Sequence, residues 1–251
     1  VIGTVTFNNI TTSGGLTLSN AATINGNLQL NTGGFISSNA PRYANTSTLT
    51  YNTGGNYGRG LEWSATGTGT IGTTAGYPNN VTISGNTALN FPNGSASTAR
   101  GMEGSLTINN GSALYMDFGS PGTTGSLTVK GNFTASGNYS LGDGNGGDLI
   151  LGGNYTEAAS GVSVNYRGRA IIFNGTGTQV ITKTGGGTVD YTGTGSAAYF
   201  LVNKASGNVQ IASNTAINLS QTSGDVLQIS NAGGIDLNGR TLTLAGNGGN
   251  V

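Results

Sequence analysis

The sequence contains no cysteine and no histidine, and only 7% of its residues are charged. The two absences exclude disulfides, thiol nucleophiles, imidazole metal ligands and the Ser-His-Asp triad. Nine Lys and Arg balance nine Asp and Glu, so no net charge draws the chain toward nucleic acid or an acidic membrane. Three Glu, three Lys and five Gln are too few for a helical bundle or an α/β enzyme. We therefore expect an all-β fold with no cofactor, no metal and no nucleic-acid partner.

Long hydrophobic runs are missing as well. No apolar stretch approaches the roughly 18 residues of a membrane span, and no signal peptide is visible, so we expect no membrane span. The chain starts at Val1 without methionine and ends at Val251 within its own repeating pattern. We interpret residues 1–251 as a single segment of a longer protein.

The sequence is instead rich in glycine, at 47 of 251 residues, and in short apolar–polar–apolar triplets separated by Gly or Asn turns. Alternation with a period of two is typical of a short strand with one buried face, and a disordered chain has no reason to keep it. The clearest triplets are residues 81–83, 89–91, 106–108, 114–116, 127–129, 149–151, 171–173, 209–211, 217–219, 235–237 and 242–244.

Two spacings organise these triplets. Neighbouring triplets often begin eight residues apart, as at Val81 and Leu89, and a longer, nearly constant step separates the starts at 106, 127, 149 and 171. A coil of roughly 22 residues built from units of about eight predicts a right-handed parallel β-helix, a β-solenoid with about three short strands per coil. A β-sandwich and an antiparallel barrel are the alternatives, but the strands are very short and there is one Trp.

The corners of such a solenoid should be marked by Gly and Asn. Asn-Gly pairs occur at 25–26, 93–94, 110–111, 174–175 and 238–239, and both residue types adopt left-handed backbone at low cost. Asn at repeated corner positions can also form ladders in which each amide bonds the next coil.

Residues 37–78 form the least regular part of the sequence, with two prolines and the only Trp. We favour a loop or coil insertion on one side of the rod. The alternative is a binding surface formed by Tyr57, Arg59, Glu62, Trp63 and Tyr77, because loops of solenoids often carry function.

Two glycine-rich motifs match G-x-G-x-x-G, at 67–72 and 142–147, about as many as this glycine content gives by chance. The second precedes a strand pattern and not a helix, so we exclude a dinucleotide site. The run from Asp143 to Leu151 resembles one imperfect copy of a calcium-binding nonapeptide, with Asp148 at the ligand position. Because such sites need successive copies, we interpret it as a corner turn.

Catalysis on a polysaccharide needs two or three carboxylates on one face. Only Asp117 and Asp143 are separated by about one coil, and no Lys or Arg accompanies them in the sequence. We therefore expect no enzymatic activity.

One motif of charged residues is repeated. Arg59 and Glu62 recur as Arg100 and Glu103, close to two coils further along the chain. This echo predicts Arg–Glu ion pairs stacked on one corner, with a ligand groove rimmed by these ions as the alternative.

Threonine-rich solenoids can also bind ice, which requires a regular Thr row on one face of every coil. Thr-x-Thr pairs occur at 4–6, 66–68 and 241–243, but not at the coil step. This irregular placement argues against an ice-binding solenoid.

Several runs together resemble the repetitive β-helical regions of large secreted surface proteins of Bacteroidetes, many of which are type IX secretion substrates. They are Leu-Glu-Trp (61–63), Tyr-Pro-Asn-Asn-Val-Thr-Ile (77–83), Leu-Thr-Ile (106–108), Gly-Thr-Gly-Thr-Gln-Val-Ile (175–181), Tyr-Phe-Leu-Val-Asn-Lys (199–204) and Asp-Leu-Asn-Gly-Arg-Thr-Leu-Thr-Leu (236–244).

The resemblance implies a structural, adhesin-like stalk at the bacterial cell surface or outside the cell. Its implied partners are the outer-membrane export machinery, surface glycans or flanking domains of the same chain. The resemblance carries over no catalytic or binding residues, and a carbohydrate-binding or carbohydrate-cleaving β-helix is the competing hypothesis.

Overall fold

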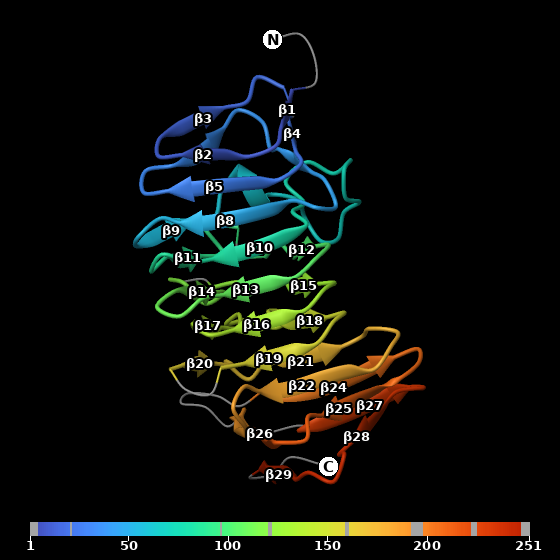
Figure 1. Cartoon of the computed structure of the whole chain (residues 1–251). Helices are drawn as coiled ribbons and strands as arrows, with labels where there is room; N and C mark the ends of the chain where they lie inside the picture. The colour runs from blue at the N-terminus through green and yellow to red at the C-terminus, as the bar shows by residue number, and fades with distance from the viewer. Residues whose placement is uncertain are drawn as a thin grey trace.

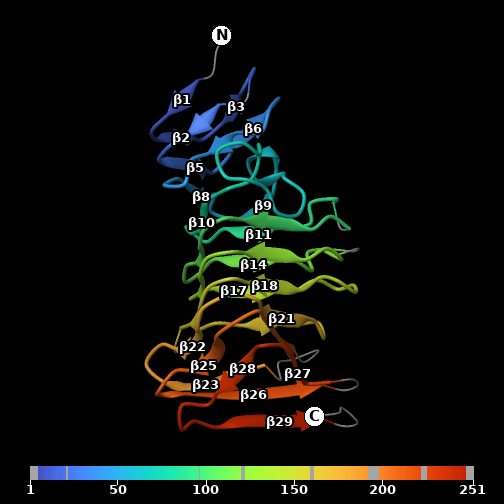
Figure 2. The same ribbon diagram turned by 90° about the vertical axis from the view of Figure 1, so that its right-hand side faces the viewer.

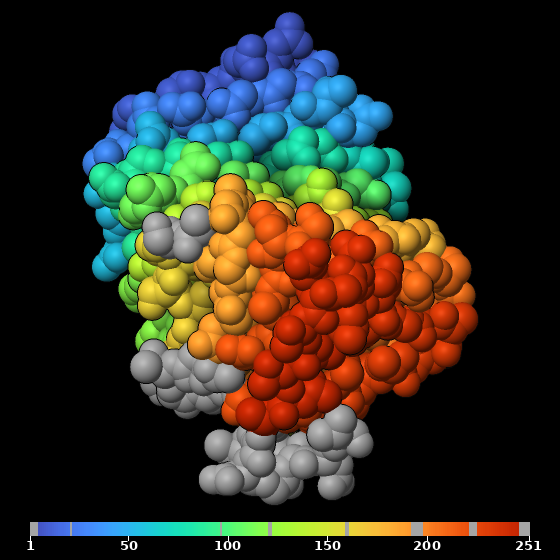
Figure 3. All heavy atoms as spheres, turned by 60° about the horizontal axis from the view of Figure 1, so that its bottom comes forward, coloured from blue at the N-terminus to red at the C-terminus, as the bar shows by residue number. Residues whose placement is uncertain are grey.

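A computed structural model describes residues 5–20, 22–95, 97–119, 122–158, 161–191, 198–221 and 225–246. The chain winds into a stack of coils that runs from the N-terminus to the C-terminus (Figure 1), and in Figure 3 successive parts of the chain follow one another as bands. Every pairing between strands is parallel, which confirms the predicted parallel β-helix and excludes the sandwich and the barrel.

Each regular coil contributes one strand to each of three faces. The front sheet contains ten strands in one unbroken order. They are β2 (Ile10–Thr12), β5 (Asn27–Asn31), β8 (Thr48–Asn52), β10 (Asn80–Ile83), β13 (Leu106–Ile108), β16 (Phe133–Ala135), β19 (Tyr155–Glu157), β22 (Gln179–Lys183), β25 (Asn208–Ile211) and β28 (Gly234–Asp236).

The second face follows the front sheet in each coil and is divided into three shorter sheets. They contain β3 (Gly15–Thr17) and β6 (Phe35–Ser37); β9 (Asn56–Gly58), β11 (Ala88–Asn90), β14 (Ala113–Tyr115), β17 (Asn138–Ser140) and β20 (Val164–Asn165); and β23 (Gly187–Asp190), β26 (Thr215–Gln221) and β29 (Leu242–Gly246).

The third face closes each coil and consists of two sheets. They contain β1 (Thr6–Phe7), β4 (Thr23–Ile24) and β7 (Arg42–Tyr43); and β12 (Arg100–Met102), β15 (Leu127–Val129), β18 (Leu149–Leu151), β21 (Ala170–Phe173), β24 (Tyr199–Lys204) and β27 (Leu227–Asn231). A single 3-10 turn, η1 (Leu61–Trp63), interrupts the all-β pattern among the described residues.

The core is a set of stacked side-chain rows, one residue per coil. In the front sheet the inward row is continuous over eight strands, and each member is fully buried. A buried aliphatic or aromatic side chain is worth about 1.5–3 kcal/mol, so stacking of coils is the main stabilising term. The row is Leu28, Leu49, Val81, Leu106, Phe133, Tyr155, Ile181 and Ile211.

The coils average roughly 25 residues per turn, somewhat longer than the sequence spacing predicted. The number of residues between paired positions of neighbouring front-sheet strands varies. The separation between Leu49 and Val81 is much longer than that between Ile10 and Leu28. The predicted equivalence of the triplets at 106 and 127 is wrong, because Leu106 pairs with Phe133 while the second triplet pairs with β12 on another face. Corners of unequal length cause this error.

The irregular part is shorter than 37–78. This range contains the regular strands β7, β8 and β9, and only the segment between β9 and β10 departs from the coil pattern. There the third face has no strand, and the chain forms η1 and a loop that projects beside β8 and β10 (Figures 1 and 2). The departure from the coil pattern is therefore confined to 59–79.

The five Asn-Gly pairs follow the expected left-handed corner chemistry only in part: at 110–111 only the glycine has positive φ, and at 25–26 and 174–175 neither residue does. Asn93-Gly94 and Asn238-Gly239 have positive φ at both residues, which a β-branched residue could not adopt without strain. The predicted Asn ladder is present along the front sheet: Asn132 Oδ1 accepts from the backbone N–H of Asn154 at 2.9 Å. No helix among the described residues has the length and apolar character needed to cross a membrane.

Candidate functional site

The five residues predicted as an alternative binding surface do not form an exposed patch. Glu62, Trp63 and Tyr77 are fully buried, and Arg59 is 4% exposed. Tyr57 is partly buried and packs against the core. The structure thus buries four of these residues inside the rod, next to the position where the third face has no strand, and leaves Tyr57 half-buried on β9.

Trp63 explains why the insertion is ordered. Its ring packs edge-on against Phe91 at a centroid distance of 5.1 Å, and its Nε1 donates to the carbonyl of Gly101 at 2.9 Å. A buried indole satisfied in this way supplies a large apolar contact without an unpaired polar atom. Trp63 therefore acts as the core residue of a coil that has no third strand.

Glu62 is the most unusual buried group. Its Oε1 accepts from Tyr51 Oη at 3.1 Å and from the backbone N–H of Gly60 at 2.7 Å, whereas its Oε2 has no partner among the described residues. Burial is the main cause that raises the pKa of this carboxyl above its usual value, and the hydrogen bonds oppose the shift. Burial therefore stabilises the protonated form of this carboxyl relative to the same group in water.

The predicted ion pairs of the repeated Arg–Glu motif are wrong. Arg59 donates to the carbonyls of Phe91 at 2.8 Å and Trp63 at 2.7 Å, and no ion pair joins it to Glu62 within the described ranges. A guanidinium group has five N–H donors, and carbonyl oxygens alone can accept hydrogen bonds from them. Arg59 is therefore buried without a carboxylate partner among the described residues.

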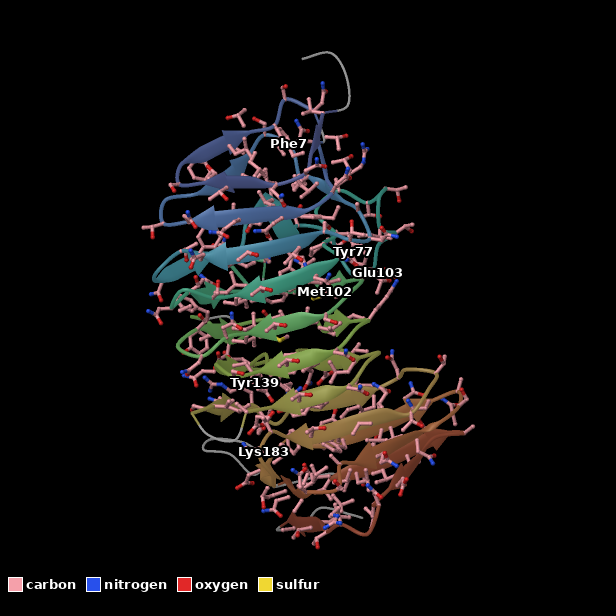
Figure 4. The ribbon with its side chains drawn as sticks, viewed as in Figure 1. Phe7, Tyr77, Met102, Glu103, Tyr139 and Lys183 are labelled. Carbon is pink, nitrogen blue, oxygen red and sulfur yellow. The ribbon has the colours of Figure 1, made fainter. Side chains whose placement is uncertain are left out.

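The second copy of the motif is also split. Arg100 donates to the carbonyl of Ser64 in the insertion, whereas Glu103 lies nearer the surface and pairs with Lys130 at 2.8 Å. Tyr77 lies beside Glu103 (Figure 4) and donates to its Oε2 at 3.2 Å. The similar residues therefore perform different tasks in the two coils.

A polar cavity of about 280 Å³ lies at the corner between the front sheet and the second face. Glu157 and Lys183 form an ion pair in its wall, with side chains only 6% and 12% exposed. They are neighbours in register, on β19 and β22. The remaining lining residues are Val162, Ser163, Val164, Thr188 and Asp190.

A chain of hydroxyl groups leads from this cavity into the core. Tyr155 Oη donates to Glu157 Oε2 at 2.9 Å and lies 2.8 Å from Tyr139 Oη. Burial raises the pKa of both tyrosines well above the usual value, so both hydroxyls stay protonated. Lys183 and Tyr155 each bind one oxygen of Glu157, so this carboxylate links β19 to the neighbouring coil.

A second cluster of charges lies at the far end of β14, β17 and β20. Arg167 pairs with Asp117 at 2.6 Å and with Asp143 at 3.2 Å, so one guanidinium joins three successive coils. Ser140 donates a further hydrogen bond to Asp117. Tyr115 and Phe118 lie beside this cluster with ring centroids 6.3 Å apart. The cluster can bind a polar ligand only by competing with these internal ion pairs.

Sequence reasoning paired Asp117 with Asp143 but missed Arg167, which joins them, and it missed the Glu157–Lys183 pair altogether. Arg167 follows Asp143, and Lys183 follows Glu157, at a separation close to one coil, and this separation was the signal in each case. The search for a partner close in the sequence could not find them. Within the described part of the chain, no three acidic side chains lie close enough together to hold a metal ion.

No family model, curated protein or solved structure matches this chain.

Proposed function

We propose that this chain is a rigid, non-enzymatic segment of a secreted or cell-surface protein that acts as a structural, adhesin-like stalk. The observation that carries the proposal is the unbroken ten-stranded front sheet with its continuous buried row. At about 4.8 Å per strand, ten strands extend roughly 43 Å along the rod. Each coil is hydrogen-bonded to both neighbours, which makes such a rod a stiff spacer.

The likeness to β-helical regions of Bacteroidetes surface proteins supports an extracellular or cell-surface location and export by a type IX system. The outer-membrane export machinery, surface glycans and flanking domains are the partners that this likeness suggests. A chain without cysteine is also insensitive to the oxidation of thiols that exposure outside the cell brings.

Antibodies against the chain test this location directly. On intact cells of the bacterium that produces it, we expect surface labelling that is lost after proteinase treatment of the cells. In a strain without the type IX translocon, the protein should not cross the outer membrane and should accumulate in the periplasm. Labelling only after cell lysis, or unchanged export in the translocon mutant, would contradict the proposed location or route.

A carbohydrate-binding or carbohydrate-cleaving protein is the competing function. Arg167 holds Asp117 and Asp143 together next to the rings of Tyr115 and Phe118, and this cluster is the observation that favours it. A glycan array and a reducing-end assay separate the two functions. The stalk predicts no turnover of any polysaccharide, whereas turnover that disappears in Asp117→Asn would replace the stalk by an enzyme.

A further inference from the structure

The outward side of the front sheet carries a straight row of threonines that the sequence spacing concealed. Strand pairing places the same central position of six consecutive strands in register, from β8 to β22. Each position is threonine, and each side chain is partly exposed. We call the set Thr50, Thr82, Thr107, Thr134, Thr156 and Thr182 the threonine row.

The row was invisible in the sequence because the coils differ in length. The step between successive members is longest from Thr50 to Thr82 and shortest from Thr134 to Thr156. A search for threonines at one fixed step in the sequence therefore does not find this row. None of the Thr-x-Thr pairs at 4–6, 66–68 and 241–243 belongs to the row, and Thr4 lies outside the described residues. Two other pairs, at 48–50 and 182–184, each contribute one member of the row.

The surface around the row is polar and uncharged from β8 to β19, whereas in β22 the apolar Val180 lies on the same side as Thr182. The outward positions of β8, β10, β13, β16 and β19, all fully described, carry no charged or aromatic side chain. Asn80, Asn132 and Asn154 lie beside the row, and each amide oxygen accepts from a backbone N–H of the next coil. These bonds hold the amides against the sheet and fix the register of neighbouring coils.

Thr50 Oγ1 donates to Asn27 Oδ1 at 2.8 Å, but hydroxyls in the middle of the row are available to solvent. Within the ranges that the structure describes, those of Thr107, Thr134 and Thr156 form no hydrogen bond with the protein. Branching at Cβ leaves threonine few χ1 rotamers, so the methyl and hydroxyl groups hold nearly fixed positions. Each hydroxyl donates one hydrogen bond and accepts others, as a water molecule does.

The geometry of the row matches an ordered water lattice. Parallel strands lie about 4.8 Å apart, so the six threonines repeat at that interval over roughly 24 Å. This interval is close to the repeat of water oxygens in hexagonal ice. Fixed methyl groups order the water between the hydroxyls, while the hydroxyls take lattice positions themselves. We propose that the threonine row binds ice.

The other faces do not offer this arrangement. In the six-stranded sheet of the third face, the equivalent outward row contains one threonine, Thr128, between Gly101 and Ile150, and continues with Ile172 and Leu201. Such a row has neither a repeated hydroxyl nor a uniform height. In the three-stranded sheet of the same face, Thr6 pairs with Thr23 and the row then ends at Arg42. An insoluble polysaccharide is the other extended lattice that a flat face could bind, but sugar rings prefer aromatic platforms, which the front face lacks over its fully described strands β8 to β19.

The test measures ice binding by the purified chain. We expect the wild-type protein to shape ice crystals in a nanolitre osmometer, to produce thermal hysteresis, and to be captured by a slowly growing ice hemisphere. Thr107→Tyr and Thr156→Tyr each place a bulky ring in the row without entering the core. Each should reduce the captured fraction at least tenfold. Thr128→Tyr is the matched control, with the same substitution at the same strand position of another face, and should leave capture unchanged.

Emission of the buried Trp63 and thermal unfolding establish that each variant is folded, and two independent row variants guard against the failure of one. Exclusion of the wild-type protein from ice without hysteresis would overturn the proposal, as would an equal loss in Thr128→Tyr. Sedimentation with crystalline cellulose or chitin that both row variants abolish, without any ice capture, would assign the row to a polysaccharide. None of these results depends on where the cell places the protein, so the stalk is tested separately.

Discussion

The buried carboxyl group of Glu62 makes the stability of this rod depend on pH in a direction opposite to that of most carboxylates. Glu62 is fully buried, its Oε2 has no partner in the described structure, and burial raises its pKa. Glu62→Gln is nearly isosteric, keeps the acceptor that Tyr51 and the Gly60 N–H use, and cannot ionise. The substitution therefore removes the titration and leaves the packing in place.

The sign of the effect follows from the raised pKa. The folded state binds the Glu62 proton more tightly than the unfolded state does, so the stabilisation is complete below the unfolded pKa. It is lost as the pH rises from that value through the folded pKa. The free energy of unfolding contributed by Glu62 changes by at most about 1.4 kcal/mol per pH unit. This corresponds to roughly 3–5 °C in Tm per pH unit for a chain of this size. Glu62→Gln should be more stable than wild type at pH 8 and close to it at pH 4.

Urea unfolding at a series of pH values, followed by fluorescence, provides the assay. Trp63 is the only Trp, is fully buried and adjoins Glu62, so its emission reports on this coil. At each pH, the free energy of unfolding of the variant is subtracted from that of the wild type. This difference cancels the titration of all other groups. Glu103→Gln, at a 33% exposed side chain, is the control and should change stability by less than about 1 kcal/mol. A difference between wild type and Glu62→Gln that does not vary with pH would refute the reasoning.

Two further predictions concern the core. Lys183→Met leaves the Glu157 carboxylate buried without its cation, and we expect a loss of about 3–5 kcal/mol in the free energy of unfolding. The double variant Glu157→Gln/Lys183→Met should recover most of this loss, and a double variant as unstable as the single one would contradict an ionic origin. Leu106→Ala removes a member of the buried row and should cost about 2–5 kcal/mol, whereas Thr107→Ala on the outward side should cost less than about 1 kcal/mol. Urea unfolding measures the free energy of unfolding of all these variants. Equal losses for Leu106→Ala and Thr107→Ala would show that the two sides of β13 are not distinguished by burial.

The sequence predicted the buried row well because each of its signals is local. Leu106 and Ile108 flank an outward Thr107, and an alternation of this kind states which side of a strand is buried. The recurrence of such triplets also predicted stacking, since one short strand cannot bury its own apolar face. No such alternation marks Trp63 and Tyr77, and only the structure shows that both side chains are buried in a coil without a third strand.

The candidate sites depended on information that no local pattern holds. Arg167 joins two acidic residues, and Lys183 joins Glu157, only because strand pairing sets coils of unequal length against each other. The long step from Leu49 to Val81 and the shorter one from Phe133 to Tyr155 both lead to the same position on the rod. Partners of this kind become visible only once the register of each coil is known.

Composition and alternation alone were sufficient to determine an all-β solenoid of three short strands per coil, because burial of every second side chain is decided within a few residues. The tertiary structure decided which residues stand above one another, because register is set by hydrogen bonds between coils and by the length of each corner. It is this register that closes the core around Glu62 and aligns six threonines on one face.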